Sequence, residues 1–173
     1  KNVVFLEGNH ETHLRSWAND DPVYSNRFKK FTAKELEGAN IKKKDVRQFC
    51  RSLAQCAYFT FKGHDVLVTH GGLTKPLATH ELTFTATEQM INGVGDYGDE
   101  NDVAYLFRKN ASPSEHQVHG HRNVNKSLMT EDGKTFNLCD DVEWGGYLRA
   151  VTFTIDNEGE FDAKEHYIRN NVF

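Results

Sequence analysis

The 173-residue sequence lacks the features that would place it in a membrane or outside the cell. It has no apolar run long enough to span a bilayer, and no signal-like apolar segment stands near its first residue. Its three cysteines, Cys50, Cys56 and Cys139, are an odd number without paired spacing. That pattern argues against a disulfide framework and favours a reducing compartment. We therefore expect a soluble cytoplasmic protein without a membrane partner.

The sequence also lacks a strongly basic balance, an internal repeat, a low-complexity tract and a linker. Its formal net charge is -4 at pH 7, so it has no sign of the basic surface used by proteins that bind nucleic acid through charge alone. An enzyme that touches nucleic acid through a small local patch is still compatible with this charge. The length fits one compact domain over residues 1–173.

Short apolar runs rich in β-branched and aromatic residues alternate with helical patterns, which predicts an α/β fold. We expect strands at residues 3–6, 58–61, 65–69, 117–118, 136–138, 148–155 and 166–168. A polar turn at residues 7–11 follows the first, and residues 62–64 join the second and third in a hairpin. Capping-box patterns at 32–35 and 85–88, together with Asp45, predict helix starts, and Gly93 predicts a helix end followed by a loop to residue 102. Since the first apolar run begins almost at once, we expect a further N-terminal part of the domain. A natural edge strand at residues 3–6 is the alternative.

Three polar clusters, residues 8–11, 69–72 and 119–122, each follow a predicted strand. Each places an imidazole or amide group beside glycine, which lets the backbone approach closely or adopt positive φ. A metal site needs such side chains to converge from several strand ends. Neutral imidazole is the commonest metal ligand, and an asparagine oxygen suits a harder cation. One cluster alone is most simply a turn, whereas three in this arrangement indicate a metal site.

The three clusters resemble the motifs of the calcineurin-like metallophosphoesterases. Gly8-Asn9-His10-Glu11 matches the GNH(E/D) motif, Thr69-His70-Gly71-Gly72 resembles the next histidine motif, and Gly120-His121 resembles the last one. The motifs occur in the family's order over nearly the whole chain. This resemblance implies an α/β/β/α sandwich of mixed sheets and a hydrolase of phosphate monoesters or diesters.

The resemblance also implies roles for individual residues. Asn9, His70 and His121 would bind the second of two divalent metal ions, while His10 would face the leaving-group oxygen as a general acid. Arg122 could hold a phosphate oxygen, with a solvated surface arginine as the alternative. The metals would clamp the phosphoryl oxygens and acidify a bridging water. Mn²⁺ is the expected metal, and the ligand set also accepts Fe, Zn or Ni.

Two family motifs, Asp-x-His and GD-x-x-D-R, have no match in this chain. In the family they supply the first-metal ligands and the aspartate that bridges the metals. We therefore expect an upstream segment or a second chain to supply them. The alternative is a non-catalytic module that keeps half of the site and binds a phosphorylated ligand or partner.

The substrate class is indicated by two further comparisons. Glu7 stands where the Ser/Thr protein phosphatases usually carry a phosphate-gripping arginine, which weakens that alternative. Residues 136–138 and 142–149 are similar to a stretch of the polynucleotide kinase-phosphatase and RNA-repair branch, which implies a nucleic-acid end as substrate rather than a phosphoprotein. The alternative there is a turn or β-bulge at residues 145–146 with Trp144 in the core. The histidines without a motif are expected at the surface: His13, His64, His80, His116 and His166.

Overall fold

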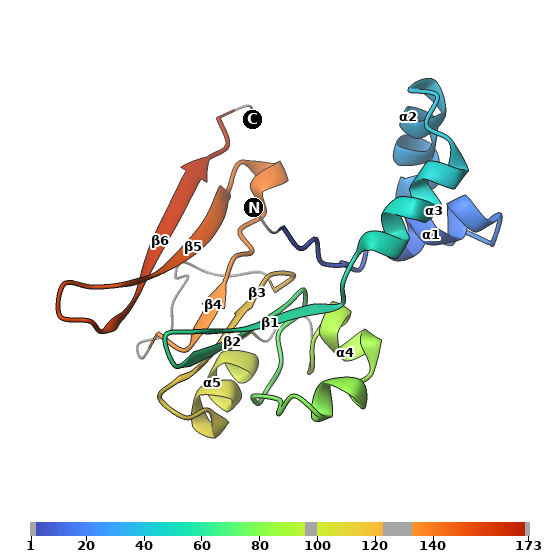
Figure 1. Cartoon of the computed structure of the whole chain (residues 1–173). Helices are drawn as coiled ribbons and strands as arrows, with labels where there is room; N and C mark the ends of the chain where they lie inside the picture. Colours follow the sequence, from blue (N-terminus) through green and yellow to red (C-terminus); the bar gives the residue numbers. More distant parts are fainter. Residues whose placement is uncertain (1–2, 96–99, 123–132, 172–173) are drawn as a thin grey trace. The chain divides into compact units, whose positions relative to one another are not determined.

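The computed structural model describes residues 3–95, 100–122 and 133–171, and the chain divides into two compact units, residues 1–54 and 55–173. Helices make up the regular structure of the first unit, and the described strands all belong to the second (Figure 1). The expected mixture of helices and strands is confirmed, and the protein has a mixed α/β structure.

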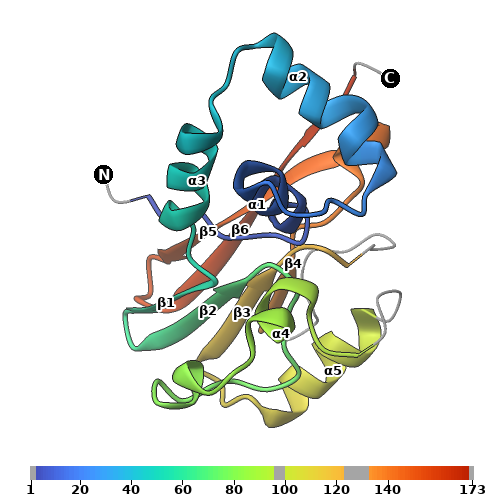
Figure 2. The ribbon, with the colours of Figure 1, turned by 90° about the vertical axis from the view of Figure 1, so that its right-hand side faces the viewer.

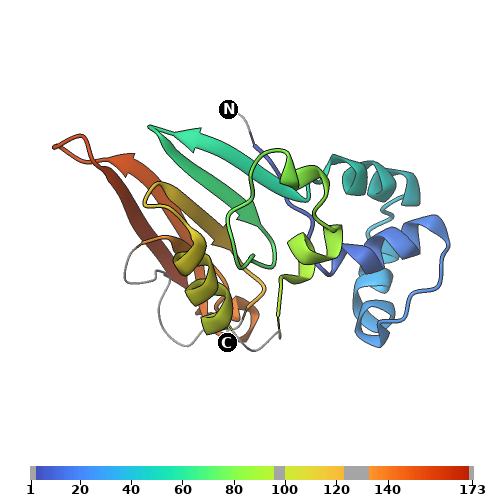
Figure 3. The same cartoon turned by 90° about the horizontal axis from the view of Figure 1, so that it is seen from below.

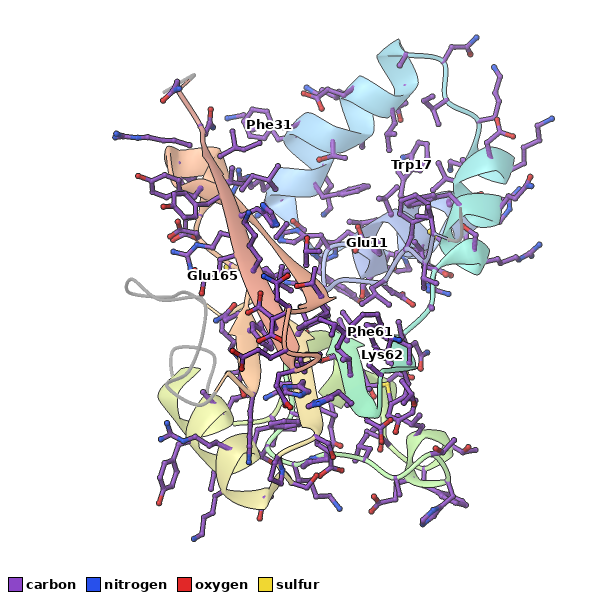
Figure 4. All side chains as sticks on the ribbon, turned by 60° about the vertical axis from the view of Figure 1, so that its left-hand side comes forward. Glu11, Trp17, Phe31, Phe61, Lys62 and Glu165 are labelled. Carbon is purple, nitrogen blue, oxygen red and sulfur yellow. The ribbon has the colours of Figure 1, made fainter. Side chains whose placement is uncertain are left out.

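The first unit is held together by packing between two of its helices. Ala18 lies in a small core with Val46 and Cys50, and Leu14 and Trp17 cover this core (Figure 4). Its helical segments, seen side by side in Figure 3, are α1 (Glu11–Asn19), a π-helical turn η1 (Phe28–Thr32), α2 (Ala33–Gly38) and α3 (Lys43–Ser52). Burial raises the pKa of the Cys50 thiol, and the residue packs as a small apolar side chain.

Several sequence predictions for helix and strand boundaries were wrong. Residues 3–5 are exposed and form no strand, and only Leu6 makes a parallel bridge, with Ala54. A helix, α1, follows directly where the sequence predicted only a turn. Neither capping box forms. Thr32, before α2, makes no side-chain capping bond, and α4 begins after Ala86, while the Thr85 hydroxyl donates to the Glu81 carbonyl at 2.9 Å. Asp45 lies in the first turn of α3 and is not its cap.

The second unit is organised around a four-stranded mixed sheet. Its strands are β1 (Cys56–Phe61), β2 (His64–Thr69), β3 (Glu115–His119) and β4 (Thr135–Asn137), in the order β1-β2-β3-β4. The β1–β2 hairpin is antiparallel as predicted, and its turn at Lys62 and Gly63 has φ of 52° and 83° (Figure 4). β2 pairs with β3, and β3 with β4, in parallel. Parallel pairing brings the carboxyl ends of three strands to one edge of the sheet.

A long antiparallel hairpin covers one face of this sheet (Figure 2). It consists of β5 (Tyr147–Ile155) and β6 (Phe161–Arg169), preceded by a 3-10 turn η3 (Val142–Trp144). Val66, Val118 and Phe136 of the sheet pack against Val151 and Phe153 of the hairpin, among others. The interface between the sheets is therefore largely apolar.

This interface corrects one prediction about the histidines. His116, expected at the surface, is buried between the sheets, where its ring stacks on Phe161 at a centroid distance of 4.4 Å. Its Nε2 atom lies 2.9 Å from Nδ1 of His64. A polar ring is tolerated here because another imidazole and a backbone carbonyl, that of Gly133, lie within hydrogen-bonding distance.

Helices cover the opposite face of the sheet (Figure 2). They are a 3-10 turn η2 (Glu81–Thr83), α4 (Thr87–Asn92) and α5 (Glu100–Asn110). Leu67 of β2 packs there with Leu73, Leu77 and Met90. Gly93 ends α4 with φ of 77°, as predicted, whereas α5 begins inside the predicted loop, whose residues 96–99 lie outside the described part of the chain. The second unit thus has helix, sheet and hairpin layers.

Within the residues that the structure describes, no helix is both long enough and apolar enough to cross a membrane.

Candidate metal centre

Two of the predicted metal ligands lie side by side in the second unit. His70 directly follows β2, and His121 lies two residues beyond the end of β3. The amide of Gly120 donates to the carbonyl of His70 at 2.9 Å, which extends the parallel pairing beyond the strands. The two half-buried imidazole rings have centroids 4.9 Å apart and planes inclined by 43°.

This spacing fits two ligands of one cation. Metal–nitrogen bonds of about 2.1 Å require the two ligating nitrogens to lie within about 4.2 Å of each other, which rings with centroids 4.9 Å apart can satisfy. No group of three or more His, Cys, Asp or Glu side chains could hold a metal among the described residues. The predicted set contains only two histidines and completes its ligands with an asparagine, which such a group does not include.

His121 is held in a strained backbone conformation. Its φ of 61° lies in the left-handed region, which non-glycine residues rarely adopt. The amide of Arg122 donates to the carbonyl of Gly120 at 2.7 Å, so the chain reverses tightly at His121. Residues with strained backbone conformations are common at functional sites, where contacts with the surrounding structure hold them in place.

Arg122 maintains part of this turn from inside the protein. Its side chain is 0% exposed, and Nε and Nη2 donate to the carbonyls of Gly71 and Val94 at 3.2 Å and 2.7 Å. The guanidinium therefore ties the segment after β2 to the segment after α4. The sequence alternative of a solvated surface arginine is wrong, while the phosphate-holding role stays a prediction.

Two glycines let these segments touch. A Cβ added to Gly71 would lie 2.0 Å from the amide nitrogen of Gly93, and one added to Gly93 would lie 2.1 Å from the carbonyl oxygen of Gly71. Both distances are far below van der Waals contact. The segment that carries His70 can therefore follow this path only with glycine at both positions.

His119 supports the same segment from the sheet. It is 1% exposed, and Gly72 packs on its ring so closely that an added Cβ would meet Cγ at 2.9 Å. The pKa of His119 is lowered to about 4, mainly by burial; the Gly120 carbonyl opposes this shift, and the nearby charges of Arg122 and His70 add to it. The ring is therefore neutral at pH 7, with Nδ1 within 3.1 Å of that carbonyl and Nε2 without a hydrogen-bond partner among the described residues.

Asn9 and His10 belong to the first unit, in the turn that leads into α1. The amide of Gly8 donates to Oε2 of Glu11 at 2.7 Å, so Glu11 closes this turn and has a structural role. Asn9 is half-buried and His10 is exposed. Because His70 and His121 lie in the other unit, the sharing of one cation by Asn9 and these histidines stays a prediction.

Glu7 is a buried carboxylate of the first unit, directly before the turn that leads into α1. It is 6% exposed and forms an ion pair with Arg15 of α1. The carboxylate that precedes residues 8–11 thus binds an arginine within its own unit.

Sequence reasoning did not foresee the burial of Arg122, and it did not single out Gln117 or Asn137, which are both 1% exposed. Both carboxamides lie within predicted strands, at residues 117–118 and 136–138. Residues 136–138 were singled out only for a resemblance that concerned the substrate, and nothing in the sequence marks either side chain as a support for a histidine segment. Only the three-dimensional contacts reveal them.

Comparison of the chain with protein-family models gives no match, and comparison with curated proteins gives none either.

We predict that Gly71→Ala disrupts the packing of the His70 segment. Its Cβ would overlap backbone at Gly93, which cannot rotate away, so we expect a loss of at least about 3 kcal/mol in the free energy of unfolding. Gly120→Ala is the matched control, because its Cβ would meet only the His70 carbonyl at 3.8 Å. Urea unfolding of both variants measures the difference. Equal midpoints for the two would show that the close approach does not exist.

We also predict a pH-dependent stability that depends on His119. The folded-state pKa of about 4 lies below the usual 6.5, so the unfolded chain binds more protons between these values. Stability is then fully present above pH 6.5 and falls as the pH drops toward 4, by about 3 kcal/mol in all. Urea unfolding in chelator at pH 7.5 and 5 should show a smaller drop for His119→Gln than for the wild type. An imidazole of His119 that titrates near 6.5 by NMR would contradict the prediction.

Proposed function

We propose that this chain carries the second-metal half of a metal-dependent phosphoesterase site, in an α/β/β/α sandwich of the calcineurin-like kind. The observation that carries the proposal is the pair of imidazoles at the carboxyl ends of two parallel strands, with centroids 4.9 Å apart. The helix, sheet and hairpin layers of the second unit support it. In open α/β sheets, ligands bind beyond the carboxyl ends of the strands.

In this proposal each residue has a defined task. His70 and His121 hold a divalent cation through ring nitrogens, and Asn9 completes the set through its side-chain oxygen. His10, an exposed imidazole, delivers a proton to the leaving-group oxygen as that oxygen gains charge. Two divalent metals, Mn²⁺ by preference, supply the neutralisation of the phosphoryl oxygens and a water of lowered pKa when bound.

The first metal's ligands come from outside this chain in the proposal. The motifs Asp-x-His and GD-x-x-D-R are absent from it, so an upstream segment or a second chain supplies them. Hydrolysis therefore requires that segment, whereas binding of one cation by His70 and His121 does not.

For the substrate we propose a nucleic-acid end, with a 3′-phosphate or a 2′,3′-cyclic phosphate. Trp144 is 70% exposed rather than in the core, and the exposed Tyr147 lies three residues further on. Exposed aromatic rings can stack on unpaired bases. The turn between them is tight, since a Cβ on Gly146 would lie 1.6 Å from the carbonyl oxygen of Asp140. The buried Glu7 disfavours a phosphoprotein substrate, because no arginine stands there to hold its phosphate.

The metal prediction is tested by Mn²⁺ titration of the chain in a calorimeter. We expect saturable binding, and we expect His70→Ala or His121→Ala to weaken it by about 100-fold or more. Mutation of a residue that merely supports a metal ligand already lowers metal affinity by about 10- to 100-fold. His166→Ala is the control, because His166 is exposed on β6, and it should leave the Mn²⁺ affinity unchanged. Hydrolysis of p-nitrophenyl phosphate is then assayed with the segment that carries the first-metal ligands. Metal binding without hydrolysis in that assay would favour the alternative function, a non-catalytic module that binds a phosphorylated ligand or partner.

The substrate prediction is tested by comparing three substrates: a 3′-phosphorylated oligonucleotide, a 2′,3′-cyclic phosphate and a phosphopeptide. We expect the nucleic-acid ends to be hydrolysed preferentially. Trp144→Ala should lower kcat/KM for the oligonucleotide by about tenfold, the size of one lost base stack, and leave p-nitrophenyl phosphate hydrolysis unchanged. Tyr24→Ala, another exposed aromatic, is the control. Preference for the phosphopeptide would overturn the assignment.

A further inference from the structure

Two buried carboxamides stand behind the histidine segments, on the face of the sheet that the β5–β6 hairpin does not cover. Val118 and Phe136 pack against the hairpin, so the residues next to them, Gln117 and Asn137, point to the opposite face. Both side chains are 1% exposed. A buried amide must find hydrogen-bond partners, and the partners of these two are informative.

Gln117 pairs with both backbone groups of a single residue. Its Oε1 accepts from the amide of Leu73 at 3.0 Å, and its Nε2 donates to the carbonyl of Leu73 at 3.0 Å. This is the pairing that a neighbouring strand would provide, supplied here by a side chain. Leu73 lies three residues after His70, and the intervening Gly72 amide donates to Oγ1 of Thr69 at 3.1 Å. The segment after His70 is thus fixed at both ends.

Asn137 performs the matching task for the other histidine. Its Nδ2 donates to the carbonyl of Arg122 at 3.0 Å, and its Oδ1 accepts from the amide of Cys139 at 3.0 Å. Arg122 directly follows His121, whose φ of 61° needs support from its neighbours. Asn137 thus holds the far side of the strained turn, while the Gly120 amide holds the near side through the His70 carbonyl.

We propose that Gln117 and Asn137 are positioning residues that set the His70 and His121 rings in their metal-binding geometry before the metal arrives. The proposal rests on the proposed function, because only that function assigns the two rings to a metal. The fixed orientation of the rings, however, is a property of the metal-free chain. Sites bind metal tightly when the residues behind the ligands hold them in place. Each carboxamide fixes one histidine segment, so their effects are separable.

The test uses Gln117→Met, which keeps the side-chain length, and Asn137→Leu, which keeps the branching at Cγ; both remove the hydrogen bonds. Val66→Ala is the control, because Val66 is equally buried but packs against the hairpin. Imidazole NMR signals of the metal-free 173-residue chain are recorded first, followed by Mn²⁺ affinity. We expect Gln117→Met to shift or broaden the His70 ring signals, and Asn137→Leu to do so for His121. Each should lower Mn²⁺ affinity at least tenfold, whereas Val66→Ala changes neither.

Each outcome decides one of the two proposals. Ring signals and Mn²⁺ affinity that match Val66→Ala at equal thermal stability would overturn the positioning role. A wild-type chain that binds no Mn²⁺ would overturn the proposed function. In that case the ring signals of the metal-free variants would still test whether the carboxamides fix the rings. Should Gln117→Met fail to fold, Gln117→Glu keeps an acceptor for the Leu73 amide, and its ionised form loses the donor to the Leu73 carbonyl. That variant should disturb the His70 ring in the same way, and undisturbed signals would refute the role.

Discussion

The parallel pairing of β2 with β3 is the constraint on which the candidate site depends. The register places Val68 opposite Val118, and the Gly120 amide then bonds to the His70 carbonyl just beyond both strands. Two histidines that are 51 residues apart in the chain (121 − 70) therefore meet at one edge of the sheet. Their proximity follows from the backbone ladder and needs no attraction between the rings themselves.

A compact polar network keeps this edge in shape. Arg122 binds carbonyls on two segments, Gly71 and Gly93 let those segments touch, and His119 fills the space beneath Gly72 as a neutral ring. Networks of this kind are stabilising when their members are satisfied and costly when they are not. The contacts suit a site that must resist movement when a cation or a charged substrate binds.

The sequence predicted the parts of the fold that local patterns determine. The β1–β2 hairpin, the strand ends at the histidine clusters and the helix end at Gly93 all follow from apolar runs next to turn residues. It did not predict α1, although Leu14, Trp17 and Ala18, which pack with residues of α3, have helical spacing, because this short apolar pattern lies among polar residues. Residues 3–5 show the opposite failure, since an apolar run forms a strand only where a partner strand exists.

The site was predicted less completely than the fold around it. Motif residues indicated that His70 and His121 belong together, and their 4.9 Å separation agrees with that. Burial of Arg122 and His116 could not be foreseen, because a charged or polar side chain is usually exposed and becomes buried only when distant backbone groups satisfy it. Gln117 and Asn137 were invisible for the same reason: their partners lie 44 and 15 residues away.

The central proposal is that one cation binds Asn9, His70 and His121. A crystal structure of the protein grown with Mn²⁺, with the metal located by anomalous scattering, measures this most directly. The expected result is a single peak bonded to a ring nitrogen of each histidine and to the side-chain oxygen of Asn9. A peak elsewhere, or an Asn9 oxygen far from a metal that both histidines bind, would contradict the proposal.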